Sequence, residues 1–272
     1  MVKIKNFRIE YDNKKVNKTD VDLLIMQIFN LTKNDIILGD KEIDETNSKF
    51  SQGLKRLESG EPISYITGIR EFMGLNFFVN PSTLIPRADT EILVETVLDL
   101  LSGKEAKILD IGCGSGCIGV SIAYYNKNVH VTEIDISKAA LETAQKNACK
   151  HGVENRVSFI NMNILTDFPQ EEFDILVSNP PYIRSDVIPT LEKNIRDFEP
   201  KTALDGGSDG LVFYKKIIEN ERIKKEGYIA FEIGYDQGND VINLLEKSGK
   251  FCEIRLMKDL ADNDRVVIAK KL

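Results

Sequence analysis

Short apolar runs alternate with amphipathic stretches from Lys107 onward, and this alternation limits the possible folds more than any other feature of the chain. The runs predict strands, and the stretches between them, with apolar residues at helical spacing, predict helices. Such alternation builds a mainly parallel sheet covered on both faces. The last two strands have no helix between them, so we expect that pair to be antiparallel. The expected strands are 107–111, 129–134, 157–160, 173–178, 228–233, 252–256 and 266–270, and the expected helices are 116–125, 137–150, 211–224 and 236–247.

A glycine-rich loop, Asp110 to Gly119, joins the first strand of this series to its helix. Glycine allows a tight turn and lets a ligand approach where a Cβ atom would clash. The helix N-terminus adds unpaired N–H donors. The spacing fits a dinucleotide, whose pyrophosphate would sit on the helix N-terminus. The glycines at 112, 114 and 116 are also similar to the loop with which methyltransferases hold S-adenosylmethionine. A purely structural turn is the third possibility.

An acidic residue ends the second strand of the series. Asp135 stands where a carboxylate can accept hydrogen bonds from both hydroxyls of a ribose. Glu133 lies on the same face of the strand and competes for this role. We favour Asp135 because it is nearer the carboxyl end of the strand, and an ordinary surface acid is the alternative.

The segment Asn179-Pro180-Pro181-Tyr182 follows the strand 173–178. Two prolines cannot continue a sheet, so the chain leaves the strand as a stiff, extended segment. It does so at the carboxyl edge of the sheet, where the glycine loop also lies and where open α/β sheets bind ligands. The Asn179 side-chain oxygen and the Pro180 carbonyl can both accept from one NH₂ group, and Tyr182 can pack on a planar amide. We therefore expect a site that binds a planar amide. The simpler alternative is a turn that only ends the strand.

The composition argues against several other kinds of function and binding site. The formal net charge is -7, which argues against sequence-independent nucleic-acid binding because that needs a basic surface. The chain has two histidines and four cysteines, none in a C-x-x-C pair, so we expect no metal site. The N-terminal residues 1–6 contain no apolar signal core, and no apolar run reaches the 18 residues of a membrane span. We expect a reduced, cytoplasmic protein.

The first part of the chain has a different pattern. We expect residues 1–18 to be frayed or loosely docked. Three short helices should follow, the first capped by Thr19 or Asp20, the second capped by Thr32 or Asn34 and ended by Gly39, and the third spanning 44–57. We expect residues 1–69 to form a small helical domain, either a structural appendage or a platform for a macromolecular partner. Residues 70–86 should form a linking β-hairpin folded around Asn80-Pro81-Ser82, and 87–272 the large domain.

Three further segments carry a resemblance that the glycine loop and Asn179–Tyr182 alone do not. They are 60–68 (GEPISYITG), 84–91 (LIPRADTE) and 196–210 (RDFEPKTALDGGSDG). Together with the two motifs, they resemble the HemK/PrmC family of peptide chain release factor glutamine methyltransferases. The resemblance covers nearly all of the chain beyond residue 18.

The resemblance implies the fold and the reaction. The fold class would be α/β: a Rossmann-like class I methyltransferase domain with a seven-stranded, mostly parallel sheet, a small N-terminal helical bundle and a linking hairpin. The reaction would transfer a methyl group from S-adenosyl-L-methionine to the side-chain amide nitrogen (N5) of the glutamine in the Gly-Gly-Gln motif of class I release factors. S-adenosyl-L-homocysteine would be the product. We expect a monomer without direct nucleic-acid or membrane partners.

The resemblance also implies roles for single residues. The residues expected to contact the cofactor are Asp110, Gly112, Cys113, Gly114, Ser115, Gly116, Asp135, Ile164 and Asn179. The residues expected to hold the glutamine are Asn179, Pro180, Pro181 and Tyr182, with Arg87 and Phe72 as further lining residues; of these, Asn179, Pro180 and Tyr182 would be catalytic. Ile164 stands where family members carry a larger aromatic residue. The stretch 183–209 is long for a connection and is a candidate flap or partner surface.

Four other functions stay open. A ribosomal-protein glutamine methyltransferase would use the same chemistry on another partner. An adenine-N6 nucleic-acid methyltransferase uses a similar motif on a flipped base, but it needs a basic groove. An NAD-dependent oxidoreductase would explain the glycine loop and not Asn179–Tyr182. A cofactor-binding regulator without catalysis is the fourth.

Overall fold

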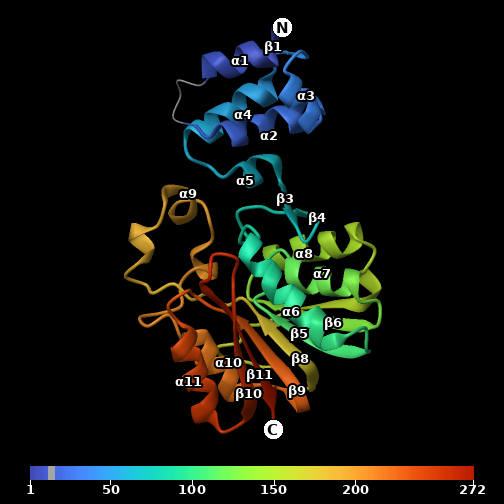
Figure 1. Cartoon of the computed structure of the whole chain (residues 1–272), viewed down its shortest axis with the longest axis vertical. Helices are drawn as coiled ribbons and strands as arrows, with labels where there is room; N and C mark the ends of the chain where they lie inside the picture. The colour runs from blue at the N-terminus through green and yellow to red at the C-terminus, as the bar shows by residue number, and fades with distance from the viewer. Residues whose placement is uncertain (12–15) are drawn as a thin grey trace. The chain divides into compact units, whose positions relative to one another are not determined.

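The computed structural model describes residues 1–11 and 16–272 (Figure 1). Contacts between residues divide the chain into two compact units. Apart from residues 12–15, the smaller unit holds residues 1–69 together with 192–198, and the larger unit holds 70–191 and 199–272. The segment predicted as a linking hairpin, 70–86, falls within the larger unit.

The smaller unit is mainly helical and has an aromatic core. Phe50 is fully buried, and the rings of Phe7 and Phe29 lie 5.4 and 5.2 Å from its ring. The described elements of this unit are β1 (Val2–Lys3), α1 (Ile4–Tyr11), α2 (Lys18–Phe29), α3 (Lys33–Leu38), β2 (Glu42–Ile43), α4 (Ser48–Glu58), α5 (Ile63–Thr67) and α9 (Lys193–Arg196).

The expectation that residues 1–18 are frayed was wrong for residues 1–11. These residues form β1, which pairs with β2, and helix α1. Ile4, Phe7 and Tyr11 are buried, and their spacing of three and four places them on one face of α1. The polar residues between them hid this spacing in the sequence. Residues 12–15 of that prediction lie outside the described residues.

Side-chain caps set where the helices of the smaller unit begin. Thr32, one of the two predicted caps, caps α3 in a reciprocal capping box with Asp35, and Gly39 ends the helix as predicted. The cap of α2 is Asn17, not Thr19 or Asp20, and the cap of α4 is Asn47, so α4 begins later than predicted. Each Asn side chain accepts from a backbone N–H of the first turn.

A β-hairpin comes next, but its turn lies elsewhere than predicted. Strands β3 (Ile69–Phe72) and β4 (Leu75–Phe78) are joined by Met73 and Gly74, whose φ angles are 51° and 68°. Two positive φ angles suit the right-handed twist of a tight hairpin. Asn80 to Thr83, where we expected the turn, form a separate bend closed by a Thr83 N–H to Asn80 C=O hydrogen bond of 2.9 Å.

The larger unit is built on one seven-stranded sheet, as predicted. Its strand order is β10-β11-β9-β8-β5-β6-β7. β10 and β9 pair antiparallel with β11, and all other neighbours are parallel. The strands are β5 (Ala106–Ile111), β6 (Val129–Asp135), β7 (Val157–Asn161), β8 (Phe173–Ser178), β9 (Ile223–Glu232), β10 (Phe251–Lys258) and β11 (Asp264–Lys271).

Helices cover both faces of this sheet (Figure 1). On β5, Ile108 packs with residues of α6 and α7, and Leu109 packs on the opposite face with residues of α10 and α11. This is the alternation that a strand imposes. The α-helices of this unit are α6 (Glu91–Leu101), α7 (Cys117–Tyr125), α8 (Lys138–Lys150), α10 (Val212–Asn220) and α11 (Gly238–Ser248); the 3₁₀ turns are η1 (Ala88–Thr90), η2 (Glu154–Arg156), η3 (Ile188–Thr190) and η4 (Lys201–Ala203).

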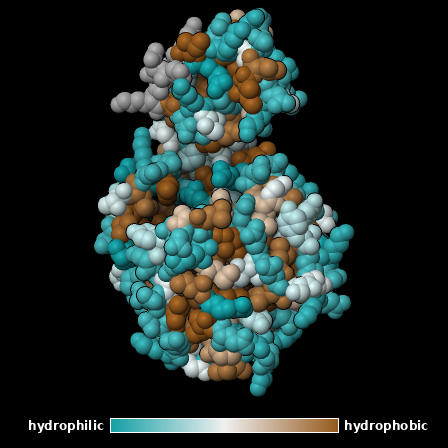
Figure 2. Space-filling view, viewed as in Figure 1, coloured by the Kyte–Doolittle hydropathy of each residue, from teal (hydrophilic) through white to brown (hydrophobic). Residues whose placement is uncertain are grey.

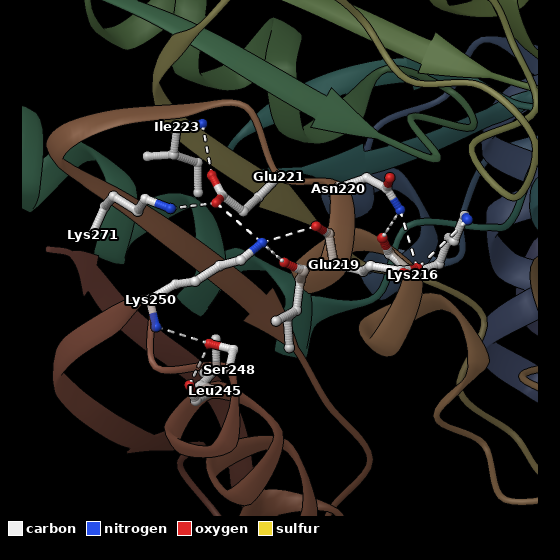
Figure 3. Close-up of polar contacts among 10 residues, drawn as sticks. Lys216, Glu219, Asn220, Glu221, Ile223, Leu245, Ser248, Lys250 and Lys271 are labelled. Atoms are coloured by element: carbon white, nitrogen blue, oxygen red, sulfur yellow. Dashed lines mark hydrogen bonds and ion pairs between the residues drawn. The ribbon is translucent and has the colours of Figure 1, made fainter.

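The C-terminal end of α10 is held by a charge cluster (Figure 3). Lys250 Nζ donates to the carbonyl oxygens of Ile218 and Glu219 at 3.0 and 2.8 Å, and it lies 3.5 Å from Oε1 of Glu221. Lys271 pairs with the same Glu221 carboxylate, which is almost fully buried. A cation here satisfies carbonyls that a helix end leaves unpaired. It also explains why α10 stops at Asn220 and β9 starts at Ile223, whereas we predicted a helix to 224 and a strand from 228.

Hydrophilic residues cover most of the face shown in Figure 2, with hydrophobic residues in patches between them. α8, with 13 residues, is the longest helix in residues 1–11 and 16–272. No helix in these ranges is long and apolar enough to cross a bilayer.

Candidate active site

The order of the strands creates a crevice at the carboxyl edge of the sheet. From β5 the chain continues through β6 and β7 on one side of the sheet and then returns to place β8 on the other side of β5. The loops that follow β5 and β8 therefore diverge, and ligands of open α/β sheets bind at such a point. The glycine loop follows β5, and Asn179–Tyr182 follows β8.

A pocket of about 410 Å³ opens at this point, entirely within the larger unit. Its size suits a small-molecule cofactor. It is lined by Ser82, Leu84, Ile111, Gly112, Gly114, Ile134, Asp135, Ile136, Ser137, Met162, Asn163, Ile164, Leu165, Ser178, Asn179, Pro180, Pro181, Pro200, Lys201, Thr202, Ala203, Asp205 and Phe213.

The glycine loop contributes bare backbone to the pocket wall. Gly112 has a φ of 74°, and a Cβ atom built on it would meet no heavy atom within 4 Å. That space is therefore free for a ligand to approach the backbone. Gly114 donates its N–H to Oδ2 of Asp135 at 2.9 Å, and Asp135 Oδ1 accepts from Ser137 N–H at 2.8 Å. These hydrogen bonds fix the glycine loop and the Asp135 carboxylate next to each other in the pocket wall.

Asp135 faces the pocket and Glu133 does not. Asp135 lines the cavity, whereas Glu133 is fully buried beneath the start of α7. A Cβ atom on Gly119 would lie 2.5 Å from Oε1 of Glu133, and one on Gly116 would lie 2.9 Å from Oε2. Glycine at these two positions lets the helix rest on the carboxylate. The geometry therefore favours Asp135 as the acid available to a ribose.

Two buried carboxylates support the loop from below. Asp110 Oδ2 accepts from Gly119 N–H at 3.1 Å, inside the first turn of α7. Burial raises the pKa of Asp110 to about 7. Burial, followed by the charge of Asp110, raises the pKa of Glu133 well above its ordinary value. A negative charge here would be favoured by the helix N-terminus and opposed by desolvation.

The segment after β8 is anchored on both sides of its prolines. Ser178 Oγ donates to the Ile111 carbonyl at 2.6 Å, which ties the end of β8 to the glycine-loop strand. Asn179 Nδ2 donates to Thr90 Oγ1 at 3.3 Å. The Tyr182 hydroxyl donates to Oε1 of Glu232 at 3.4 Å. These bonds hold the two side chains that flank Pro180 and Pro181.

Two oxygens of this segment are left available. In the part of the chain that the structure describes, no hydrogen bond ends at Asn179 Oδ1 or at the Pro180 carbonyl. Asn179 and Pro180 both line the pocket. Two acceptors on adjacent residues of a pocket wall can receive both hydrogens of one NH₂ group.

A second loop packs on the backbone of the segment. A Cβ atom on Gly206 would lie 2.7 Å from the Pro181 carbonyl oxygen, so only glycine fits there. Gln237 Nε2 donates to the Tyr182 and Gly210 carbonyls at 3.1 and 3.3 Å. Gly206 and Gly210 both lie against the backbone of this segment, which gives a steric reason for glycine at these two positions.

Several predicted residues do not line the pocket. Asp110 lies under the loop, Cys113 packs on Leu141 and Ala144, and the Ser115 carbonyl accepts from Asn147. Gly116 caps α7. The other predicted site residues that do not line the pocket are Phe72, Arg87 and Tyr182.

Phe72 and Arg87, expected as further lining residues of the substrate site, have other partners. Phe72 is 1% exposed and packs edge-on against Phe77 in the core of the larger unit. Arg87 pairs with the buried Glu199 carboxylate, which also accepts from Ile85 N–H at 3.5 Å. This pair joins the stretch before α6 to Pro200, a residue of the pocket wall. Arg87 thus supports the wall from outside.

Thr90, Glu232 and Gln237 were missed by the sequence reasoning. Glu232 ends β9 at the same edge of the sheet as Asp135, so the signal that pointed to Asp135 could also have pointed to Glu232. Thr90 and Gln237 had no comparable signal.

The residues present fit S-adenosylmethionine. Gly112 offers open backbone, Asp135 offers a carboxylate at the cavity wall, and Ile136, Ile164 and Leu165 offer apolar surface for a base. Among residues 1–11 and 16–272, no group of three or more His, Cys, Asp or Glu side chains could hold a metal ion.

Comparisons with known proteins agree with this geometry. A family model described as a methyltransferase small domain matches residues 87–219, and one described as a PrmC N-terminal domain matches residues 13–68. The crystal structure of a methyltransferase from Pyrococcus furiosus is similar with a TM-score of 0.53 and 19% identity, covering 81% of this chain and 98% of that chain. This likeness is evidence for the fold alone.

Other relatives have a higher sequence identity to this chain. The release factor glutamine methyltransferase of Clostridium botulinum is 45% identical over 233 residues, which cover 84% of this chain and 82% of the relative. That of Flavobacterium psychrophilum is 40% identical over 283 residues, which cover 97% of this chain and 98% of the relative. The resemblance seen in the sequence is confirmed, and the chain belongs to the family of release factor glutamine methyltransferases.

Proposed function

We propose that this chain transfers a methyl group from S-adenosylmethionine to the side-chain amide nitrogen of the glutamine in the Gly-Gly-Gln motif of a class I release factor. The observation that carries the proposal is the pair of available acceptors, Asn179 Oδ1 and the Pro180 carbonyl, at the wall of a cofactor-sized pocket. The relatives at 45% and 40% identity, which are named release factor glutamine methyltransferases, support it.

The cofactor would lie along the carboxyl edge of the sheet. Gly112 and Gly114 would face it with their backbone, Asp135 would accept from its ribose hydroxyls, and Ile164 would pack on its base. When bound, its sulfonium group supplies an activated methyl group. Because the donor is already activated, much of the catalysis can come from positioning.

Asn179 and Pro180 would position the amide. An amide nitrogen is a weak nucleophile, since its lone pair is delocalised into the carbonyl. By accepting both N–H groups, Asn179 Oδ1 and the Pro180 carbonyl would fix the plane of the amide and favour the growth of positive charge on its nitrogen. As the new N–C bond forms, the S–CH₃ bond breaks with its electron pair left on sulfur, and the nitrogen releases one proton to solvent. Tyr182 does not line the pocket, and through its contact with Glu232 it would hold the end of the segment in place. No histidine or cysteine is needed for these roles.

The smaller unit would recognise the release factor. It has a core of its own, and Ile37 and Leu38 are 68% and 70% exposed on it. Exposed apolar side chains favour a protein partner. Such a substrate would place the enzyme in the cytoplasm. We expect Leu38→Asp to raise the KM for an intact release factor and not for a short glutamine peptide; an equal effect on both would argue against recognition by this surface.

The proposed function is tested by intact-mass analysis. A class I release factor is incubated with the enzyme and S-adenosylmethionine, and the modified residue is mapped by peptide fragmentation. We expect the mass of one methyl group on the Gly-Gly-Gln glutamine and no change when that glutamine is replaced by alanine. Ribosomal protein and duplex DNA are incubated in parallel, and preferential methylation of either would contradict the proposal.

A further inference from the structure

Glu232 is a buried acid that the proposed reaction does not use. It is the last residue of β9 and is 1% exposed. On this strand, Ala230 packs with the residues of α6 and α7, while Phe231 packs on the opposite face. By alternation, Glu232 projects to the same side as Ala230, toward η1 and α6. A buried carboxylate without a role in packing needs an explanation.

The Glu232 carboxylate lies behind both side chains that flank the prolines. Its Oε1 accepts from the Tyr182 hydroxyl at 3.4 Å. Its Oε2 is buried and accepts no hydrogen bond of ordinary geometry in the described part of the chain. The Thr90 hydroxyl adjoins the carboxylate closely enough to lower its pKa. Thr90 is itself 2% exposed, and its Oγ1 accepts from Asn179 Nδ2.

These contacts decide which end of the Asn179 amide faces the pocket. A threonine hydroxyl has one hydrogen to donate, and an ionised carboxylate can only accept. Beside an ionised Glu232, the favourable direction for the Thr90 hydrogen is therefore toward the carboxylate, which leaves the Thr90 lone pairs for Asn179. Asn179 must then turn Nδ2 toward Thr90, which leaves Oδ1 for the substrate. In the opposite orientation, Asn179 would present its own NH₂ to the NH₂ of the substrate, and no hydrogen bond could form.

We propose that Glu232 is a positioning residue that, through Thr90, fixes the Asn179 side chain with Oδ1 toward the amide to be methylated, and that also holds the Tyr182 hydroxyl. The inference rests on the proposed function. It adds to it the group that determines whether Asn179 presents a hydrogen-bond acceptor or a donor to the substrate amide. Glu232 touches neither substrate nor cofactor in this role.

The surroundings of Glu232 make its charge responsive to pH. Burial raises the pKa of Glu232 to about 7, and the Thr90 hydroxyl and the Arg265 charge act against this effect. The charged and titratable groups near it are Arg265 of β11, Asp89 of η1, Tyr182, and the buried Tyr214 of α10 and Cys117 of α7. Arg265 forms its ion pairs with Asp89 and Asp259, so the charge of this cation is shared among several carboxylates. A protonated Glu232 can donate to Thr90, which frees Thr90 to donate to Asn179 and reverses the amide.

The test uses the full-length enzyme with an intact release factor. Glu232→Gln replaces the acceptor-only carboxylate by an amide of the same shape. We expect kcat to fall by about 10- to 100-fold, the usual effect of losing a hydrogen bond to a charged group, while the Kd for S-adenosylmethionine changes by less than about twofold. The decrease of the wild-type rate below about pH 7 should be absent in Glu232→Gln. Glu246→Gln, an exposed change on α11, is the matched control and should behave as wild type.

Variants of Thr90 provide an independent test if Glu232→Gln does not fold. Thr90→Val should lower kcat as much as Glu232→Gln, and Thr90→Ser, which keeps the hydroxyl, should restore it to within about threefold of wild type. The double variant should be no slower than the slower single variant, because both changes break one chain of contacts. A wild-type enzyme that does not methylate glutamine would refute the proposed function. If the wild type is active, two results would overturn this inference and leave the proposed function standing. One is a normal rate and pH profile in Glu232→Gln or Thr90→Val; the other is a double variant whose loss of kcat is the product of the two single losses.

Discussion

Asn179 Nδ2 donates to Thr90 Oγ1 at 3.3 Å, across 89 positions of the sequence. This one contact links the turn before α6 to the segment that follows β8. It leaves Asn179 Oδ1 available at the pocket wall beside the Pro180 carbonyl. The site is therefore a composite of segments that only the folded sheet brings together.

Asp135→Asn should weaken cofactor binding. The carboxylate faces the pocket and can accept from two hydroxyls, and an amide accepts more weakly. We expect the Kd for S-adenosylmethionine, measured by calorimetry, to rise by about 10- to 100-fold. Asp99→Asn, an exposed change on α6, is the control. An unchanged Kd in Asp135→Asn would place the ribose elsewhere.

Gly206→Ala should slow methyl transfer without weakening cofactor binding. The new Cβ atom would lie 2.7 Å from the Pro181 carbonyl oxygen and 2.8 Å from Tyr182 Cα, so the segment 179–182 must shift. A displacement of this size is expected to lower kcat by about 100-fold. Gly249→Ala adds backbone strain but meets open space, and it should alter stability alone. If kcat of Gly206→Ala matches that of Gly249→Ala, close packing of the second loop is not needed for catalysis.

Parts of this arrangement could be predicted from the sequence, and others could not. The glycine loop, Asp135 and Asn179–Tyr182 are continuous motifs at strand ends, so local patterns locate them. Thr90 and Glu232 matter only through partners 89 and 50 positions away, and no local pattern records such pairs. The hairpin turn was misplaced for a related reason: Met73 adopts a positive φ, which its residue type does not indicate.

Lys250→Ala should destabilise the larger unit and leave its chemistry intact. It removes two hydrogen bonds to the carbonyls that end α10 and one of the two cations beside the buried Glu221 (Figure 3). We expect the free energy of unfolding in urea to fall by about 1 to 3 kcal/mol, with kcat unchanged. Lys247→Ala, exposed on α11, should have little effect. Equal stabilities of the two variants would show that the cluster contributes nothing.

The stability of the enzyme should depend on the titration of Asp110. Burial raises the pKa of Asp110 in the folded state from 3.8 to about 7, so the folded state binds more protons than the unfolded state between these values. Its contribution to stability is therefore present below about pH 4 and is lost as pH rises to 7. Asp110→Asn cannot titrate. We expect its Tm relative to wild type to rise between pH 4 and pH 7, and a constant or falling difference would contradict this assignment.

The central claim is that Asn179 holds the reacting amide. The most direct test measures two quantities on Asn179→Ala: the Kd for S-adenosylmethionine by calorimetry, and the single-turnover rate of methyl transfer to a release factor at saturating cofactor. We predict a Kd within about threefold of wild type and a rate lower by about 100-fold or more. A Kd that weakens as much as the rate falls would place Asn179 in the cofactor site only. A rate equal to that of wild type would contradict the account altogether.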